Sequence, residues 1–596
     1  MVENKIIDYP GGINNLTYEI IKYLGNISSI LWDLAGVFFV VLLCVLTYVY
    51  NDNKENNKEP VKNFFFNSSF FFLLVFSLGI IVLRFPTFSF PELSPDESEW
   101  ISGAATLIRD GRFWHSVNGT TSGPINIFPL CLINLFSFGL NYSTVRIFCV
   151  IFIVIPTAVF LFKSLKMELS ELAARTILIP VFLLFAISEH EDITAYNSEH
   201  FPMLLTILAF YFFVKAKQSS EEKTELRKIF LYNFICGIIL GLLPFSKLQS
   251  IPISFVFFFI VFTNNIIYKN FAVCKNIALS LGAILPSIIV IVYIYYFDLT
   301  DAFWNYFIVS NIEYSFKGIV NSSPTWYLQN FEKIDSWIGK IFIVPHIILK
   351  SKEFILFFGT LFSISVFCFF YLLKKDVYIL KNKKKYFIYL ILIFLFACFG
   401  VSKPGNVFHH YCLLIVIPAC LLTGFLLGLT YETVNSNKIK KYLKYYLLVY
   451  AIIPTILFVL DGNCYIKYIL KTDSFNKISN TAVILKKYSR PNDRLAVWGY
   501  MNKFFVEAEL IQGTREPMSY LQITNSCKQD YYINNYCKDI KENKPVLFVD
   551  AVGEKSLFYK DYSQRHENFP AIKELVNEYY EFIDSVDNVR IYKRKK

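Results

Sequence analysis

The chain has 596 residues, of which 55% are apolar and 18% are charged, and its formal net charge is +11. A soluble protein would carry about 25% charged residues, so the composition excludes an ordinary soluble globular protein. The excess positive charge lies mostly in short loops between apolar runs, where it sets orientation in a membrane. We therefore expect no nucleic-acid partner.

The charged residues are unevenly distributed along the chain. Of the 105 charged residues, 40 lie in the last 136. This pattern predicts an α-helical polytopic membrane protein with a small soluble α/β domain at its C-terminus. We divide the chain into an N-terminal extension with the first transmembrane helix (1–63), a transmembrane region (64–460) and the C-terminal domain (461–596).

Apolar runs predict about twelve transmembrane helices. A helix that spans a bilayer needs about 20 apolar residues, with a range near 17–25. The candidate runs are 31–50, 64–90, 144–162, 176–188, 200–214, 229–245, 251–268, 277–297, 353–373, 387–401, 411–430 and 445–460.

Lysine and arginine distinguish two sets of loops between these runs. Loops 51–63, 163–175, 215–228, 269–276, 374–386 and 431–444 carry 23 Lys and Arg in 75 residues, whereas loops 91–143, 189–199, 246–250, 298–352 and 402–410 carry 9 in 133. The positive-inside rule makes the first set cytoplasmic. The protein is thus expected in the cell membrane, with the second set of loops, the N-terminus and the C-terminal domain outside the cytoplasm.

This orientation decides how the apolar run 124–138 is interpreted. Counting it as a span would place the acidic loop 189–199 inside and the basic loop 163–175 outside, so we expect it to lie at the outer face. In the C-terminal domain, runs 495–500, 546–552 and 589–593 are typical of strands, and helical patterns cover 474–488 and 570–583.

The first large external loop carries a conspicuous acidic pair. Asp96 and Glu97 directly follow Pro95, where the chain leaves the membrane. Acidic residues at such a place can simply cap the helix that follows. The functional alternative is that a carboxylate at the membrane surface acts as a general base or metal ligand for a hydroxyl acceptor.

The second external loop, EHEDITAYNSEHFP, contains four acidic residues and no Lys or Arg: Glu189, Glu191, Asp192 and Glu199. Such acids can be ordinary solvated charge at a membrane face. Because this loop and the first external loop lie on the same side, they can also form one cluster around a cation or a sugar.

Basic residues stand alone at the outward ends of several runs, namely Lys247, Lys403, His409 and His410, the last followed by Tyr411. Ionisable groups at such depths are functional candidates. The alternative is that their side chains reach to lipid headgroups. A cation or imidazole there suits a lipid phosphate in the outer half of the bilayer.

The sequence lacks several known nucleotide-binding, hydrolase and metal-binding motifs. It contains no GxxxxGK[ST], no GxGxxG after a strand, no HExxH, no GxSxG and no Cys/His metal spacing. Nothing on the cytoplasmic side is built for a nucleotide. If the protein is a transferase, its donor is already in the membrane.

Three stretches resemble a known superfamily. The loop PDESEWISGAATLIRDGRFW, followed by TTSGPINIFPL, resembles the first external loop of the GT-C glycosyltransferases, most of all the bacterial protein O-mannosyltransferase-like and aminoarabinose-transferase-like branch. Asp96, Glu97, Trp100 and Pro124 match its pattern. NVFHHYCLLIVIPACLL is similar to the branch's His–Tyr and Pro helix, and RLAVWGY to the strand that opens its C-terminal domain.

The resemblance implies sugar transfer from a polyprenyl-phosphate carrier to a cell-envelope acceptor (lipid, glycan or protein) on the outer face. It makes Asp96 and Glu97 catalytic, and Asp96 with Glu199 ligands of a possible Mg²⁺ or Mn²⁺. The implied substrate-binding residues are Trp100, Asp192, Tyr196, Glu199, Lys247, His409, His410 and Tyr411. Membrane lipids are further partners.

One departure from the aminoarabinose-type pattern concerns the donor phosphate. Those enzymes place a Lys before the prolines at the end of the first loop, whereas this chain has Thr121-Ser122-Gly123-Pro124. Lys247 or His410 is expected to take over that contact. The alternative functions are a polytopic transporter or flippase and a non-catalytic scaffold. A carboxylate pair in an outward cavity favours the enzyme, and a continuous pore favours the transporter.

Overall fold

The computed structural model describes residues 13–50, 68–135, 139–222, 225–267, 271–317, 337–375, 383–433, 437–471, 478–556 and 558–596. The predicted cytoplasmic loop 51–63 lies outside these ranges. So do parts of loops 298–352, 374–386 and 431–444 and the first residues of the predicted helix 474–488.

Within these ranges, eleven helices are long and apolar enough to cross a membrane. They are α2 (Ile27–Val49), α4 (Ser69–Phe88), α7 with α8 (Tyr142–Glu168), α11 (His200–Glu221), α12 (Leu226–Ser246), α13 with the preceding turn (Leu248–Ile267), α14 (Ala272–Tyr296), α20 (Lys352–Lys375), α22 (Lys384–Ser402), α23 with the preceding turn (His409–Thr433), and α24 (Asn437–Asp461), which α25 (Cys464–Lys471) follows. These agree with eleven of the twelve predicted runs. The polytopic helical fold is thus confirmed.

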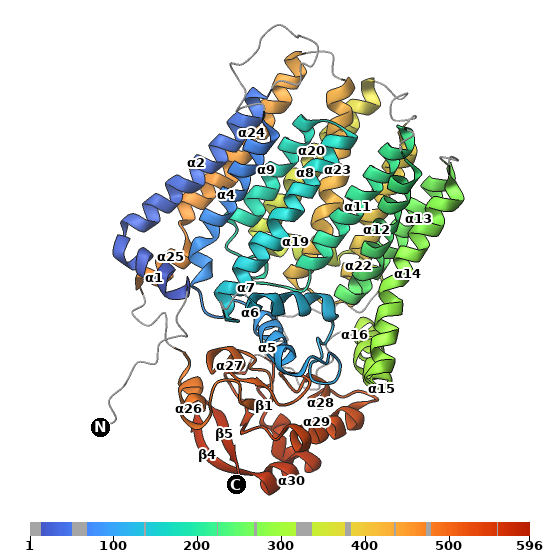
Figure 1. Cartoon of the computed structure of the whole chain (residues 1–596). Coiled ribbons are helices and arrows are strands. Elements are labelled where there is room, and N and C mark those ends of the chain that lie inside the picture. The colour runs from blue at the N-terminus through green and yellow to red at the C-terminus, as the bar shows by residue number, and fades with distance from the viewer. Residues whose placement is uncertain are drawn as a thin grey trace.

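The remaining predicted run, 176–188, is also helical. It forms α9 (Glu171–Phe182), which continues as a π-helical segment, Leu183–Ile187. This helix is shorter than the others, and every residue of α9 is buried, since α4, α8 and α23 surround it (Figure 1).

The chain ends on the side where it begins. Helix α1 (Ile13–Leu24) and the C-terminal domain lie at the same end of the helical bundle (Figure 1). Within the described residues, eleven helices long and apolar enough to cross a membrane, together with α9, lie between α1 and the C-terminal domain, and this even number fits their placement at one end. The short connecting helices α5 (Pro95–Asp110), α6 (Cys131–Leu135), α10 (Glu191–Thr194) and α16 (Ser310–Lys317) lie at this end too.

The apolar run 124–138 does not span the membrane. Its described part, Pro124–Leu135, consists of two 3₁₀ turns and α6, and it is too short to cross. In Figure 1, α6 lies across the end of the bundle beside α5 and α7. The prediction of a segment at the membrane face agrees with this placement.

The C-terminal domain is built on one mixed sheet. Its strands are β1 (Arg494–Trp498), β2 (Ile511–Gln512), β3 (Leu547–Asp550), β4 (Tyr580–Val586) and β5 (Val589–Arg594), in the order β2-β1-β3-β5-β4. β1 is parallel to β2 and β3, and β5 pairs antiparallel with β3 and β4. The predicted α/β class is confirmed.

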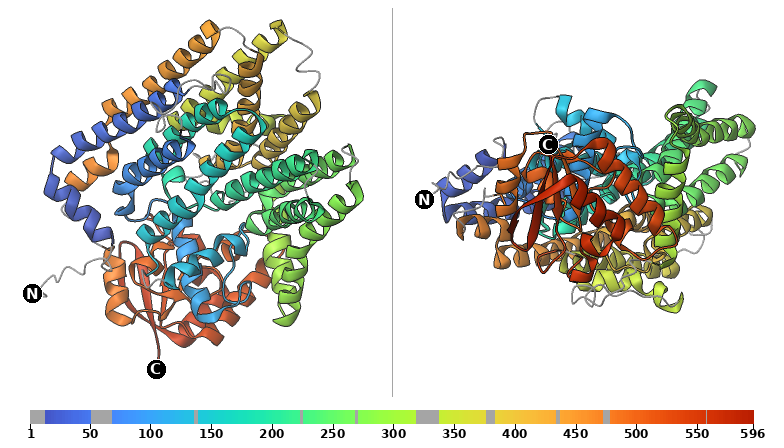
Figure 2. Two further views of the ribbon diagram at one scale, coloured as in Figure 1. Left: turned by 45° about the horizontal axis from the view of Figure 1, so that its top comes forward. Right: turned by 90° about the horizontal axis from the view of Figure 1, so that it is seen from below.

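Helices flank this sheet (Figure 2). They are α26 (Asn480–Tyr488), α27 (Lys503–Glu507), α28 (Tyr520–Ile523), α29 (Gln529–Asn543) and α30 (Pro570–Tyr579). Helix α29 is held on β1 by Tyr536, whose hydroxyl donates to the Val497 carbonyl at 3.1 Å. The predicted helix 570–583 was wrong at its end, because residues 580–583 pair with β5 as part of β4.

Helix α5 is the platform on which the C-terminal domain rests. Asp110 at its end forms an ion pair of 2.6 Å with Arg494 of β1. The backbone N–H of Gln512 in β2 donates to the Thr106 hydroxyl at 3.0 Å. These contacts fix the domain over the loops at the ends of the membrane helices.

Candidate functional site

A cavity lies between the ends of the membrane helices and the C-terminal domain. Its floor comes from α5 and the loop that follows, its sides from the ends of α12, α16 and α23, and its cover from the C-terminal domain. The lining residues are Asp96, Glu99, Trp100, Thr120, Thr121, Lys247, Tyr314, Phe408, His410, Tyr411, Tyr500, Met518, Tyr520, Phe558 and Tyr559.

Asp96 occupies the first turn of α5, directly after Pro95 at the helix start. Its carboxylate faces His410, whose Nε2 lies 4.0 Å from Asp96 Oδ2. The Asp96 carboxylate also accepts a 3.4 Å hydrogen bond from the Tyr500 hydroxyl. Burial raises the pKa of Asp96, although His410 and Lys247 oppose the shift. A carboxylate in such a place is suited to accept a proton.

Asp192 and His410 form the second element of the site. Asp192 Oδ1 lies 3.3 Å from His410 Nδ1. Burial alone would raise the pKa of Asp192, but the opposite charge and hydrogen bond of His410 lower it to about 2. Asp192 is therefore ionised at neutral pH and orients the His410 ring toward Asp96.

Glu199 and Lys247 form the third element. The Lys247 ammonium contacts Glu199 Oε1 and donates to the Ser198 hydroxyl at 2.7 Å, and both charged side chains are buried. Lys247 also lies over the Tyr411 ring, 4.9 Å from its centroid. Burial alone would raise the pKa of Glu199, but the charges of Lys247 and His410 and the hydrogen bonds from Lys247 and Ser198 together lower it.

The position of Lys247 follows from a close approach of two segments. Lys247 ends α12 and forms an antiparallel bridge with Ser122, and the Gly123 N–H donates to the Ser246 carbonyl at 2.9 Å. A Cβ atom at Gly123 would lie 1.9 Å from the Phe245 carbonyl oxygen. Only glycine permits this contact, which brings the first external loop to Lys247.

His410 thus connects three acidic side chains, one from α5 and two from the second external loop. Its Nε2 lies 3.9 Å from Glu199 Oε1, in addition to its contacts with Asp96 and Asp192. The sequence predicted that Asp96 and at least one of Glu97, Asp192 and Glu199 approach each other in one outward cavity. In the structure Asp192 and Glu199 lie against His410, which also faces Asp96. Trp100 and Tyr411 also line the cavity, as proposed.

Of the predicted site residues, Glu97 and Tyr196 neither line the cavity nor pair with His410. The Glu97 carboxylate is fully buried and bound by Arg146 through two hydrogen bonds of 2.8 and 2.6 Å. Tyr196 is also fully buried, and its hydroxyl donates to the Asn126 carbonyl at 2.6 Å. Neither residue lines this cavity, and the contacts of both are with the protein itself. A catalytic role for Glu97 and a substrate-binding role for Tyr196 stay predictions.

Replacing Glu97 by Gln is expected to destabilise the protein rather than to remove a catalytic step. Breaking a buried ion pair leaves an uncompensated charge and costs about 3–5 kcal/mol. Arg146→Met should give a similar loss. Thermal unfolding of the purified protein in detergent checks both variants. Unchanged stability with lost transfer in Glu97→Gln would return Glu97 to the chemistry.

His409 lies behind the cavity rather than in its lining. Its ring lies 4.7 Å from the His190 ring, between centroids, and its Nδ1 lies 3.9 Å from Asp192 Oδ2. His190, Asp192 and His409 each offer one donor atom, and these lie within 4.8 Å of one another. These types of ligand, at this spacing, fit one divalent metal ion.

The predicted metal pair is less suited to an ion. Glu199 is already neutralised by Lys247, and neither Asp96 nor Glu199 belongs to a described group of three donors within reach of one ion. The histidine–aspartate group also contains His409 Nε2, a buried nitrogen that has no hydrogen-bond partner among the described residues.

Several lining residues were not predicted. Glu99 was accessible to sequence reasoning, because it lies three positions after Asp96 and therefore on the same helix face. Tyr500, Tyr520, Phe558 and Tyr559 come from the C-terminal domain. No local signal marks them, since only the docking of the domain places them over the cavity.

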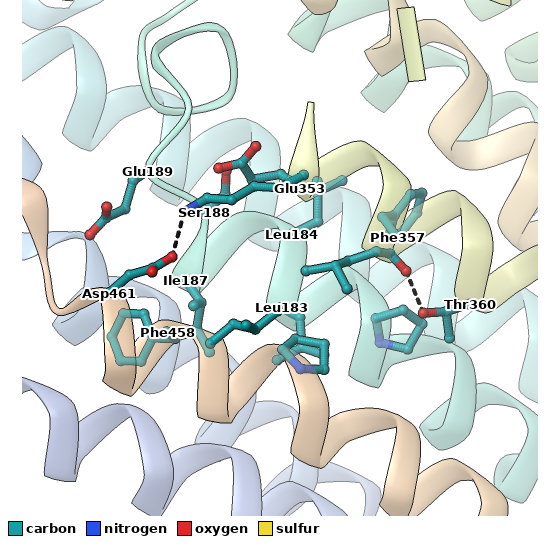
Figure 3. Close-up of a pocket in the computed structure, with 15 residues that line it drawn as sticks. Leu183, Leu184, Ile187, Ser188, Glu189, Glu353, Phe357, Thr360, Phe458 and Asp461 are labelled. Carbon is teal, nitrogen blue, oxygen red and sulfur yellow. Dashed lines mark hydrogen bonds and ion pairs between the residues drawn. The ribbon is translucent and has the colours of Figure 1, made fainter. Parts of the chain in front are cut away.

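A second cavity lies within the bundle, between the π-helical end of α9, α20 and α24 (Figure 3). Its walls are apolar, with Leu183, Ile187 and Phe458 among them. Its rim carries Glu189 and Asp461, and Asp461 forms a 2.7 Å ion pair with Lys352. It contains none of the residues around His410.

Comparison with known proteins places the fold. No family model matches the sequence, and no curated protein matches it. The crystal structure of ArnT from Cupriavidus metallidurans bound to undecaprenyl phosphate is similar over 88% of this chain and 98% of that chain, with a TM-score of 0.53 and 10% identity.

The oligosaccharyltransferase of Archaeoglobus fulgidus, tethered to an acceptor peptide, is also similar, over 88% of this chain and 74% of that chain, with a TM-score of 0.42 and 12% identity. On the strength of the first likeness, the chain shares the overall fold of ArnT. The fold expected from the resemblance is thus confirmed.

Proposed function

We propose that the protein is a glycosyltransferase that moves a sugar from a polyprenyl-phosphate carrier to a cell-envelope acceptor on the outer face of the membrane. The observation that supports it most is the cavity in which Asp96 faces His410 and Lys247 at the ends of the membrane helices. The phosphate of a lipid-linked donor is expected near the ends of membrane helices. The fold shared with the undecaprenyl-phosphate-bound ArnT adds support.

In this reaction an acceptor hydroxyl attacks the anomeric carbon of the donor sugar. The new carbon–oxygen bond forms as the bond to the phosphate oxygen breaks, and that oxygen keeps the electron pair. Asp96 takes the acceptor proton. Lys247 and His410 stand where negative charge develops on the leaving polyprenyl phosphate and favour the transition state.

The aromatic lining suits a sugar. Trp100 and Tyr411 come from the membrane region, and Tyr500 and Tyr520 from the C-terminal domain. Their rings offer flat apolar faces, and the tyrosines add hydroxyl groups. We propose that the C-terminal domain completes the substrate site by covering it with these rings.

The outward orientation of the site gives a direct prediction. Cys527 is an exposed thiol of the C-terminal domain. A membrane-impermeant maleimide should label it in intact cells, and Cys527→Ser should remove that label while leaving the label on Cys464, which is also exposed. Labelling only after the cells are opened would place the domain, and the cavity, in the cytoplasm.

A divalent ion, where the reaction uses one, would be held by His190, Asp192 and His409, and it would stabilise negative charge beside the cavity. We expect His190→Ala to weaken Mn²⁺ binding by about 10–100-fold or more, the scale of a perturbed metal site. Calorimetric titration of the purified protein measures it, with His115→Ala as control. Equal binding by wild type and His190→Ala would exclude this site.

The test of the function uses the envelope itself. A strain without the gene should lose one sugar modification in mass spectra of its glycans and lipids, and purified protein in proteoliposomes should release polyprenyl phosphate from a synthetic polyprenyl-phosphate sugar when envelope extract is added. Transfer of the intact lipid between leaflets without sugar release would instead support the transporter alternative.

A further inference from the structure

Glu99 is an acidic side chain of the cavity that the proposed reaction has not used. It follows Asp96 by three positions on α5, so the two side chains project from the same face of the helix. Only 3% of Glu99 is exposed, and that part lines the cavity. The Thr120 hydroxyl, which also lines the cavity, donates to Glu99 Oε1 at 3.0 Å.

The cations near Glu99 are already engaged. Lys247 is bound by Glu199, and His410 is paired most closely with Asp192. The carboxyl groups of Asp96 and Glu99 therefore share one buried cavity, and of the two only Asp96 has a described cationic partner within 4.0 Å, the His410 ring. When two carboxyl groups share a buried site, repulsion between their negative charges favours a state in which one of them keeps its proton.

The groups around Glu99 show which carboxyl group keeps the proton. Burial raises its pKa well above the ordinary value, and the charge of Asp96 raises it further. Glu516 of the C-terminal domain adds to this effect, while Lys247 and the Thr120 hydrogen bond oppose it. Asp96 is more exposed and has His410 opposite it, so Asp96 is the carboxyl group that ionises.

We propose that Glu99 acts as the protonated partner of Asp96 and donates a hydrogen bond to an oxygen of the bound sugar. This inference rests on the proposed glycosyl transfer and adds a specificity-determining residue to it. One Glu99 oxygen accepts from Thr120, and the carboxyl proton is directed to the substrate. A sugar with a hydroxyl facing Glu99 accepts the hydrogen bond from the carboxyl proton. A sugar that lacks this hydroxyl leaves the buried Glu99 donor unpaired.

The protonation state can be measured without substrate. Infrared spectra of the purified protein at neutral pH should contain the carbonyl stretch of a protonated carboxyl group that Glu99→Gln removes. Glu516→Gln serves as the matched control, because Glu516 is a second buried acid nearby with a pKa raised to about 7 by burial. If Glu99→Gln removes no such band, Glu99 is ionised and the proposal fails.

The role toward the sugar is tested by two substitutions. Gln imitates a protonated Glu, so Glu99→Gln should keep transfer within about threefold, whereas Glu99→Ala should raise KM for the donor or lower kcat by about tenfold, the scale of one hydrogen bond. Transfer by the wild type should fall at alkaline pH as Glu99 and the His410 imidazolium lose their protons. Glu99→Gln should lack the part of this fall that belongs to Glu99, so its alkaline limb should differ from that of the wild type.

The acidic limb of the pH profile of transfer shows the result that would contradict the proposal. An ionised Glu99 raises the pKa of Asp96, so Glu99→Gln would shift the acidic limb to lower pH, and that outcome would overturn the proposal. Wild-type profiles in both variants would also overturn it. A wild type that releases no polyprenyl phosphate refutes the proposed transfer itself, and it leaves the infrared result as a separate finding.

Discussion

Asp96→Asn is expected to lower sugar transfer by about 10²–10⁴-fold, the contribution of a positioned general base. Asn keeps the size of the side chain and can still accept the hydrogen bond from Tyr500, but it cannot take the proton of the acceptor hydroxyl. The effect should fall on kcat, because proton transfer belongs to the transition state. Initial rates of polyprenyl-phosphate release measure it.

The pH dependence of the wild type provides a second measure of the same residue. Burial raises the pKa of Asp96, and a base works only when deprotonated. Transfer should therefore rise with pH through a midpoint above the ordinary value of about 3.9 for Asp. Asp530→Asn, on the exposed face of α29, is the control and should leave the profile unchanged. Near-normal turnover by Asp96→Asn would mean that another group accepts the proton.

Hydrophobicity was a sufficient guide to the membrane region. A helix in lipid must satisfy all its backbone hydrogen bonds internally, so a long apolar run has one available structure. The run 176–188 shows where this rule is weakest, since α9 is enclosed by other helices and its length is not set by the bilayer. Described residues of four lysine-poor loops, among them Asp96, Lys247, Tyr314 and Phe408, line the one cavity at this end of the bundle.

The side-chain directions could not be read so directly. Asp96, Glu97 and Glu99 lie within four positions, yet Asp96 and Glu99 face the cavity while Glu97 faces Arg146, 49 residues further on. Only the rotation of α5 about its axis decides which of the three side chains face the cavity. Nothing in the sequence indicates that Arg146 is the partner of Glu97. Strand β4 was missed for a related reason, because its exposed, acidic residues acquire strand structure by pairing with β5.

Lys247 is the second position where a large effect is expected. Lys247→Met should lower kcat by about 10²–10³-fold, the loss typical of one group that stabilises transition-state charge. The substitution also leaves Glu199 buried without its cation, which is expected to cost about 3–5 kcal/mol of stability. A fall in activity alone therefore cannot assign Lys247 to the donor phosphate.

The double variant Lys247→Met/Glu199→Gln separates the two effects. Removing both charges should restore much of the thermal stability, because no unpaired ion is then buried. If Lys247 also holds the leaving phosphate, transfer should stay about 10²–10³-fold below wild type despite the recovered fold. Glu199→Gln alone supplies the control for the loss of the acid. Recovery of wild-type turnover in the double variant would show that Lys247 serves only to neutralise Glu199, and His410 would then be the cation left to face the phosphate.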